Sequence, residues 1–104
     1  MPQLKYTREA ISDLGRISDF MKKVSPDQLT DALQTIQNGL KRLTILPNIG
    51  KSVAYETLPN LRQLSINYGK SGYIALYVFD EENDEVVIVG IRHKRELEFE
   101  ILRD

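Results

Sequence analysis

Apolar residues in the first half of the chain recur every three or four positions. This spacing predicts two amphipathic helices, over residues 8–24 and 26–46. Thr7 is suited to cap the first helix, and Pro47 ends the second. Almost no linker separates them, so we expect an antiparallel helical hairpin. The predicted apolar stripes are Ala10, Ile11, Leu14, Ile17, Met21 and Val24, then Leu29, Ala32, Leu33, Ile36, Leu40 and Leu43, with polar residues such as Asp13 left on the solvent side.

Two local signals refine the second helix. Ser25-Pro26-Asp27-Gln28 combines an N-cap residue, a proline at the first helical position and a glutamine three residues after the cap, which predicts a capping box. Gly39 lies inside the helical pattern, where glycine is less stable than alanine by roughly 1 kcal/mol. We therefore expect close packing at Gly39.

The second half of the chain follows the period of strands. Residues 61–68 alternate between apolar and polar, 73–79 form a continuous apolar run that is typical of a central strand, and 86–91 are nearly all apolar. Short turns between them predict an antiparallel meander. Residues 3–6 predict a further short strand, 48–60 an irregular connection and 96–102 a last helical turn or two. The pattern predicts one α+β domain over residues 1–104, a helical hairpin on a small antiparallel sheet.

Composition narrows the functional classes. The 104 residues contain no cysteine, which excludes disulfides, thiolate nucleophiles and cysteine-ligated zinc and is compatible with a reducing cytoplasm. The net charge of −1 lacks the basic excess of a dedicated nucleic-acid binder. No secretory signal or membrane span is evident, so we expect a cytoplasmic protein. The sequence predicts no cofactor and no metal site.

The candidate binding site is a run of cationic and imidazole side chains directly after the last apolar strand. It comprises Arg92, His93, Lys94 and Arg95. Arg62 begins an earlier strand, and we expect the meander to bring it to the same end of the sheet. Converging guanidinium groups bind phosphates and carboxylates well. The alternative is that these residues only keep a strand end soluble, or pair with Glu96, Glu98 and Glu100.

No catalytic residue can be assigned from these side chains. His93 is the only histidine, and its near-neutral pKa suits general acid–base chemistry. A lone histidine at a strand end is more often a hydrogen-bonding surface residue. Strand tyrosines such as Tyr68 and Tyr73 are suited to stack on bases, although packing in the core or at its rim is the commoner role.

The order of several motifs along the chain resembles the RelE/ParE superfamily of toxins from bacterial type II toxin–antitoxin modules, also called plasmid stabilisation proteins. The motifs are Tyr6 to Ala10, Asp13-Leu14, the LxxLPNIG stretch from Leu43 to Gly50, Leu61 to Leu64, Gly72 to Tyr77 and Val89 to Glu96. The resemblance implies an antitoxin that neutralises the toxin and joins it in binding operator DNA. We expect that antitoxin to lay an extended or helical segment along apolar surface and the sheet edge, with a short acidic stretch against Arg92–Arg95.

The resemblance leaves two activities open. RelE-like members cleave mRNA on the ribosome, and ParE-like members poison DNA gyrase without being enzymes. The arginine that the nuclease pattern carries after the strand tyrosine is Ile74 here, Phe99 stands near the expected late tyrosine, and Lys51 alone represents a lysine-rich stretch. Lys94-Arg95-Glu96 is retained. The departures favour a ParE-like gyrase inhibitor, with a ribosome-dependent endoribonuclease or a detoxified antitoxin-binding module as alternatives.

Overall fold

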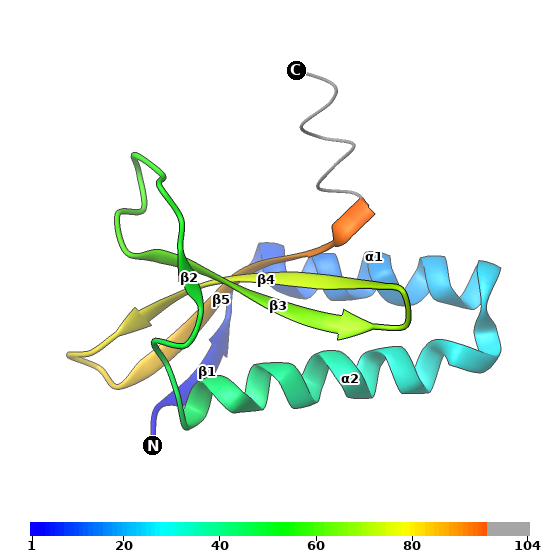
Figure 1. The fold of residues 1–104 in the computed structure, drawn as a ribbon, viewed down its shortest axis with the longest axis horizontal. Helices are drawn as coiled ribbons and strands as arrows, with labels where there is room; N and C mark the ends of the chain where they lie inside the picture. Colours follow the sequence, from blue (N-terminus) through cyan, green and yellow to red (C-terminus); the bar gives the residue numbers. More distant parts are fainter. Residues whose placement is uncertain (96–104) are drawn as a thin grey trace.

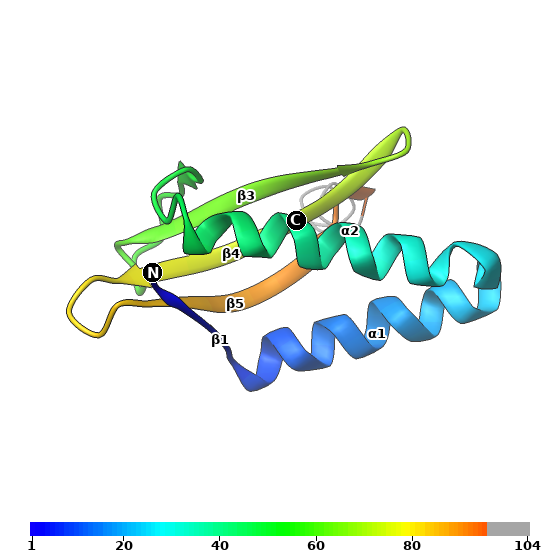
Figure 2. The same ribbon diagram turned by 90° about the horizontal axis from the view of Figure 1, so that it is seen from below.

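Two antiparallel helices pack on one face of a twisted five-stranded sheet in the computed structural model, which describes residues 1–95 (Figures 1 and 2). The order of strands across the sheet is β1-β5-β4-β3-β2. The predicted α+β class and the helical hairpin are confirmed. The elements are β1 (Gln3–Tyr6), α1 (Arg8–Val24), α2 (Leu29–Lys41), β2 (Lys51–Ser52), β3 (Leu61–Tyr68), β4 (Ser71–Asp80) and β5 (Glu85–His93), with 3₁₀ turns η1 (Pro26–Gln28) and η2 (Arg42–Thr44).

The sheet is mixed, so the prediction of a purely antiparallel sheet is wrong. The meander β3-β4-β5 is antiparallel as expected, but β1 pairs with β5 in parallel, with Gln3 opposite Glu85. The path of the chain between them makes β5 run in the same direction as β1. The alternation of residues 3–6 does not predict this direction. The predicted irregular connection also contains a short strand, because Lys51 pairs with Gln63 on the outer edge of β3. The expected helix at 96–102 and Phe99 lie outside the described residues.

The two helix starts differ from each other. Thr7 caps α1 as predicted, since its Oγ1 accepts the N–H of Ala10 at 3.1 Å. The predicted capping box at Ser25 is wrong. Ser25 makes no side-chain capping bond; its backbone N–H instead closes α1 by donating to the carbonyl of Met21 at 2.8 Å. The residues from Pro26 to Gln28 form a 3₁₀ turn, and α2 begins only afterwards.

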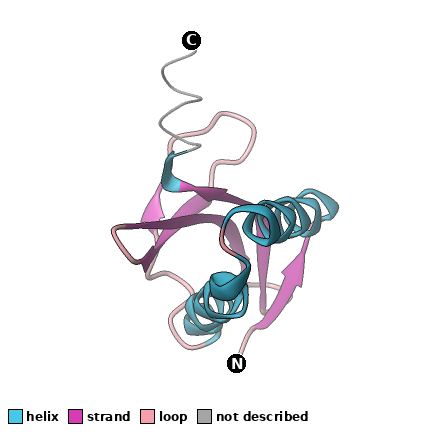
Figure 3. Cartoon of the chain, turned by 90° about the vertical axis from the view of Figure 1, so that its right-hand side faces the viewer, coloured by secondary structure: helices cyan, strands magenta, loops and turns pink. Residues whose placement is uncertain are grey.

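The core lies between the hairpin and the sheet. Its largest fully buried side chains are Tyr77, Ile36, Leu40, Leu43, Ile88, Ile91 and Val86. Close packing at Gly39 is confirmed, because a Cβ there would lie 2.8 Å from the Ile66 side chain. Two predicted core positions of α1 are wrong: Ile11 is 60% exposed and Val24 is 57% exposed. The helix therefore buries a narrower face than its apolar stripe. Figure 3 shows the two helices end-on against the sheet. No helix within residues 1–95 is long and apolar enough to cross a membrane.

Candidate functional site at the end of strand β5

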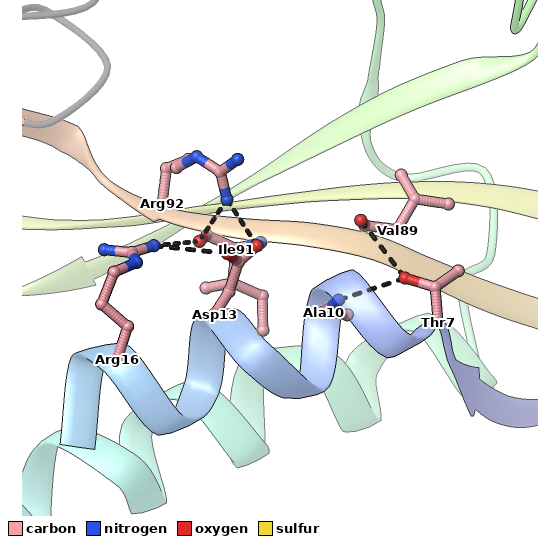
Figure 4. A network of polar contacts seen from close by, with 7 residues as sticks. All are labelled: Thr7, Ala10, Asp13, Arg16, Val89, Ile91 and Arg92. Carbon is pink, nitrogen blue, oxygen red and sulfur yellow. Dashed lines mark hydrogen bonds and ion pairs between the residues drawn. The ribbon is translucent and has the colours of Figure 1, made fainter. Parts of the chain in front are cut away.

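Helix α1 takes the place of a neighbouring strand along the second half of β5 (Figure 4). Strand β1 pairs with β5 only as far as Ile88. Beyond that point, the Thr7 N–H donates to the Ile88 carbonyl at 3.0 Å and the Thr7 hydroxyl to the Val89 carbonyl at 3.4 Å. The N–H of Ile91 donates to Asp13 Oδ2 at 3.0 Å. Thr7 and the side chain of Asp13 on α1 therefore satisfy backbone hydrogen-bonding groups along an edge of β5 that would otherwise be open.

Asp13 is the centre of a charged network at this edge. Arg92 Nη1 donates to Asp13 Oδ2 and, at 3.1 Å, to the carbonyl of Ile91. Arg16 lies 3.4 Å from Asp13 Oδ1 and donates to the same carbonyl at 3.4 Å. Figure 4 shows both arginines directed at this point. The Asp13 side chain is only 13% exposed, so its predicted place on the solvent side is wrong.

Helical periodicity gave no signal for this network. Asp13 is one turn away from Ala10 and Ile17 at the border of the buried face, where a short carboxylate reaches the strand backbone. The one sequence feature that contained it was the Asp13-Leu14 motif. Because Arg92 is matched by this carboxylate, its guanidinium holds α1 against β5.

The predicted convergence of Arg62 with the basic run is wrong. Arg62 is opposite Tyr77 on β4, and Tyr77 is opposite Ile88 on β5, whereas His93 is opposite Tyr73. Strands β3 and β5 run in the same direction on either side of β4, so the start of β3 lies beside the start of β5. Along the strand direction, the register places Arg62 roughly 16 Å from His93 at the usual rise of a strand.

Arg62 fastens the loop that follows α2. Its Nη1 donates to the carbonyls of Gly50 at 2.7 Å and Asn48 at 3.3 Å. Beside it, the buried Tyr77 hydroxyl accepts the N–H of Gly50 and donates to the Pro47 carbonyl, both at 2.8 Å. Burial raises the pKa of Tyr77, and the Gly50 hydrogen bond and the Arg62 charge partly oppose that rise. The LPNIG stretch is thus a structural anchor.

Glycine is required at position 50 of this anchor. A Cβ there would lie 2.6 Å from the Tyr77 ring and hydroxyl and 2.7 Å from the carbonyl oxygen of Gln63. Next to the anchor is a hollow of about 750 Å³, and Arg62, Val78, Val87 and Val89 are among its lining residues.

The last three members of the basic run lie where β5 ends. His93 packs edge-on against Tyr73, with ring centroids 5.3 Å apart and planes at 89°, and its Nδ1 accepts the N–H of Arg95 at 3.1 Å. The Lys94 ammonium donates to Asn67 Oδ1 at 3.0 Å, and Arg95 is exposed. The structure therefore divides the predicted cluster into Arg92, whose guanidinium is bound by Asp13, and a surface group, His93 to Arg95.

A hydrophobic residue faces Arg92 across the sheet. Ile74 pairs with Arg92 on β5 and with Ser65 on β3, and it is 7% exposed. Ile74 therefore supplies no cation opposite Arg92 on β4. Within residues 1–95, no group of three histidine, aspartate or glutamate side chains is placed to hold a metal ion. The arrangement offers cationic recognition at a strand end.

Comparison with known protein families shows which family the chain matches. Residues 4–98 match the model of the ParE toxin of type II toxin–antitoxin system, parDE. A chain of the chromosomal ParDE toxin–antitoxin system from P. aeruginosa is similar in structure, with a TM-score of 0.70, 28% sequence identity and coverage of 89% of this chain and 96% of that chain. No curated protein matches the sequence.

RelE structures share the fold at lower similarity. The isolated E. coli RelE toxin has a TM-score of 0.61 and 15% identity, covering 99% of this chain and 97% of its own. A chain of the RelBE2 toxin–antitoxin complex from Mycobacterium tuberculosis has a TM-score of 0.56 and 24% identity, covering 89% and 91%. The recognised superfamily is confirmed, and the family match is on its ParE side.

Proposed function

The chain belongs to the ParE toxin family of type II toxin–antitoxin systems, and from that premise we propose that it inhibits DNA gyrase and that a cognate antitoxin neutralises it. Under this proposal the chain is not an enzyme. It acts by binding, and the surface group His93 to Arg95 is the part of the basic run available to contact a target or the antitoxin.

The pairing of Ile74 with Arg92 is the observation that favours gyrase over RNA cleavage. Cleavage of RNA without a metal needs a group to activate the 2′-hydroxyl and cations to stabilise the charge that develops on phosphorus. A buried isoleucine occupies the cross-strand position, and Arg92 is engaged by Asp13. His93 Nδ1 accepts a backbone N–H. This end of the sheet therefore supports a binding role better than a nuclease role.

An antitoxin partner is supported by the structural neighbours. The similar chains come from structures described as a ParDE system and as RelBE toxin–antitoxin complexes. We extend that partnership to this chain. With a net charge of −1, the toxin itself has no excess of positive charge for DNA, so operator binding is assigned to the complex.

The deciding experiment compares two targets with one preparation of the chain. Purified protein is added to DNA gyrase, where supercoiling and accumulation of cleaved DNA are measured, and to programmed ribosomes, where mRNA integrity is measured. We expect loss of supercoiling with intact mRNA at micromolar protein. Cleaved mRNA with normal gyrase activity would establish the ribosome-dependent alternative. No effect in either assay, together with harmless expression in the absence of antitoxin, would establish a detoxified module.

A further inference from the structure

Gly15 has no structural reason inside the chain for being glycine. It lies in the middle of α1, where glycine weakens a helix relative to alanine. At Gly39 and Gly50 an added Cβ would collide with a neighbouring side chain. At Gly15 it would meet nothing within 4 Å in the described part of the chain apart from its own helix backbone. A close approach that requires glycine at this position can therefore come only from another molecule.

A shallow hollow surrounds Gly15 on the solvent side of α1. Its volume is about 540 Å³. Figure 2 shows α1 along one margin of the molecule, and Phe20 beside the hollow is 62% exposed. We refer to the residues that line the hollow as the α1 face: Ser12, Gly15, Arg16, Asp19, Phe20 and Lys23. The α1 face thus combines a gap over a glycine, an exposed aromatic ring and charges of both signs.

The α1 face is complementary to a second copy of itself. An antiparallel pair of α1 helices with a two-fold axis between residues 17 and 18 places each residue opposite the one equally far on the other side of that point. At about 100° per residue, all six members of the α1 face then lie toward the second copy. The pairs formed between the copies are Gly15 with Phe20, Arg16 with Asp19 and Ser12 with Lys23, each made twice.

These pairs match in shape and in charge. Each Phe20 ring would fill the gap over Gly15 of the second copy, and burial of an aromatic ring is the largest gain open to a small interface. Asp19 is exposed, and the Arg16 side chain is 44% exposed. The five N–H donors of Arg16 can serve Asp13 within the chain and Asp19 of the second copy together. Opposite charges therefore meet at the centre of the pair.

We propose that the α1 face is a homodimer interface, in which Phe20 of each copy packs over Gly15 of the other. The proposal goes beyond the proposed function and does not rest on it, because it needs neither a target nor an antitoxin. Helix α1 has 17 residues and is about 25 Å long. One helix face of this length is smaller than a standard interface, so the dimer is weak, with a dissociation constant of roughly tens of micromolar.

Sedimentation equilibrium of the purified chain tests the dimer over a concentration series from about 1 to 500 μM. We expect F20D to raise the dissociation constant at least about tenfold, because it places a carboxylate over the gap. The matched control is I11D. Ile11 is 60% exposed but lies half a turn around α1 from Phe20, so its substitution should change the dissociation constant by less than about threefold.

Gly15→Leu separates a lost interface from a lost fold. Its side chain extends into open space in the single chain, and leucine favours a helix more than glycine does. The variant should therefore unfold at no lower urea concentration than the unaltered chain, measured well below the dissociation constant. In the dimer the leucine occupies the place of the Phe20 ring. We expect dimerisation to weaken at least about tenfold.

Cross-linking tests the antiparallel arrangement. The chain contains no cysteine, so introduced thiols report without background. S12C/K23C should form a covalent dimer under mild oxidation, because the two positions face each other between copies and lie about 16 Å apart within one helix. S12C alone and K23C alone should stay uncross-linked, since each position is equally far from its own counterpart in the second copy.

The outcomes are decisive in either direction. Dimerisation that F20D and G15L both weaken, with I11D unchanged and S12C/K23C cross-linked, supports the α1 face as the interface. A chain that stays monomeric over the whole series overturns the proposal. A dimer that F20D and G15L leave intact places the interface elsewhere and overturns it as well. If the chain is monomeric and F20D instead weakens binding of a cognate antitoxin, the occupant of the α1 face is the antitoxin and not a second copy.

Discussion

Arg62 and Arg92 lie at opposite ends of the sheet, and both use guanidinium donors on oxygens of their own chain. Arg62 donates to the neutral carbonyls of Asn48 and Gly50 beside a buried tyrosine hydroxyl. Arg92 pairs with a carboxylate, Asp13, and so joins a helix to a strand edge. One end is held by hydrogen bonds to backbone groups and the other by an ion pair.

This comparison shows how an arginine at a strand rim should be interpreted. Its sequence neighbours indicate cationic recognition, but its function depends on whether its donors are already satisfied within the fold. Arg95, three residues after Arg92, is exposed. The two anchors share no residue, so they can be broken separately.

Tyr77→Phe should have the largest effect, because it breaks the anchor beside Arg62. The substitution leaves the buried N–H of Gly50 and the carbonyl of Pro47 without the hydroxyl that bonds both, and each unsatisfied buried group costs about 1–3 kcal/mol. We expect a loss of about 3 kcal/mol in urea unfolding. Tyr55→Phe, at a position that is 58% exposed, is the control and should be neutral. A loss no larger than that of the control would show that Arg62 alone holds the loop.

Asp13→Ala should have the next largest effect, because it breaks the charged anchor. It removes the acceptor of the Ile91 N–H and leaves Arg92 without its carboxylate. We expect a loss of about 1–3 kcal/mol and faster hydrogen exchange at the Ile91 amide. Asp13→Asn keeps one acceptor and should lose less. Asp19→Ala, at an exposed position of the same helix, is the control; equal losses at positions 13 and 19 would contradict the anchor.

Most of the fold could be predicted from periodicity alone. The helical hairpin, the meander and the central burial of β4 follow from local spacing, because each depends on which faces are apolar. The close packing at Gly39 follows from the cost of a glycine inside a helix. The parallel pairing of β1 and the two-residue strand β2 could not be predicted. They are set by the path of the chain between distant segments, which no local pattern records.

The candidate site was predicted less well than the fold. The residues of the basic run were correctly placed at the end of β5, but the prediction counted charges and not their partners. Asp13 was assigned to solvent because its helical phase lies at the border of the buried face. The prediction that Arg62 lies beside the basic run had the strand direction wrong. Strands β3 and β5 are parallel to each other, so the start of β3 lies near the start of β5 and not near its end.

Alkaline pH should lower the free energy of unfolding through Tyr77, by less than either substitution does. Burial raises the pKa of Tyr77 above its ordinary value of 10.0. The unfolded chain therefore loses the phenolic proton first, so the free energy of unfolding is unaffected below pH 10 and falls as pH rises above it. Unfolding is measured at a series of pH values across this range. Tyr77→Phe should show a shallower decline than the unaltered chain, and identical slopes would contradict a raised pKa.

The surface part of the basic run should have the smallest effect on folding and the clearest effect on function. Lys94 makes one exposed hydrogen bond and Arg95 is exposed, so the K94A/R95A variant should change the free energy of unfolding by less than about 0.5 kcal/mol. Growth of cells expressing it without antitoxin is then compared with the unaltered chain and with K22A/K23A. Recovered growth in K94A/R95A alone would assign target contact to this end of β5. Undiminished toxicity would indicate that these cations only keep a strand end soluble. Because Arg62 and Arg92 are already engaged by the fold, the target surface would then have to lie elsewhere.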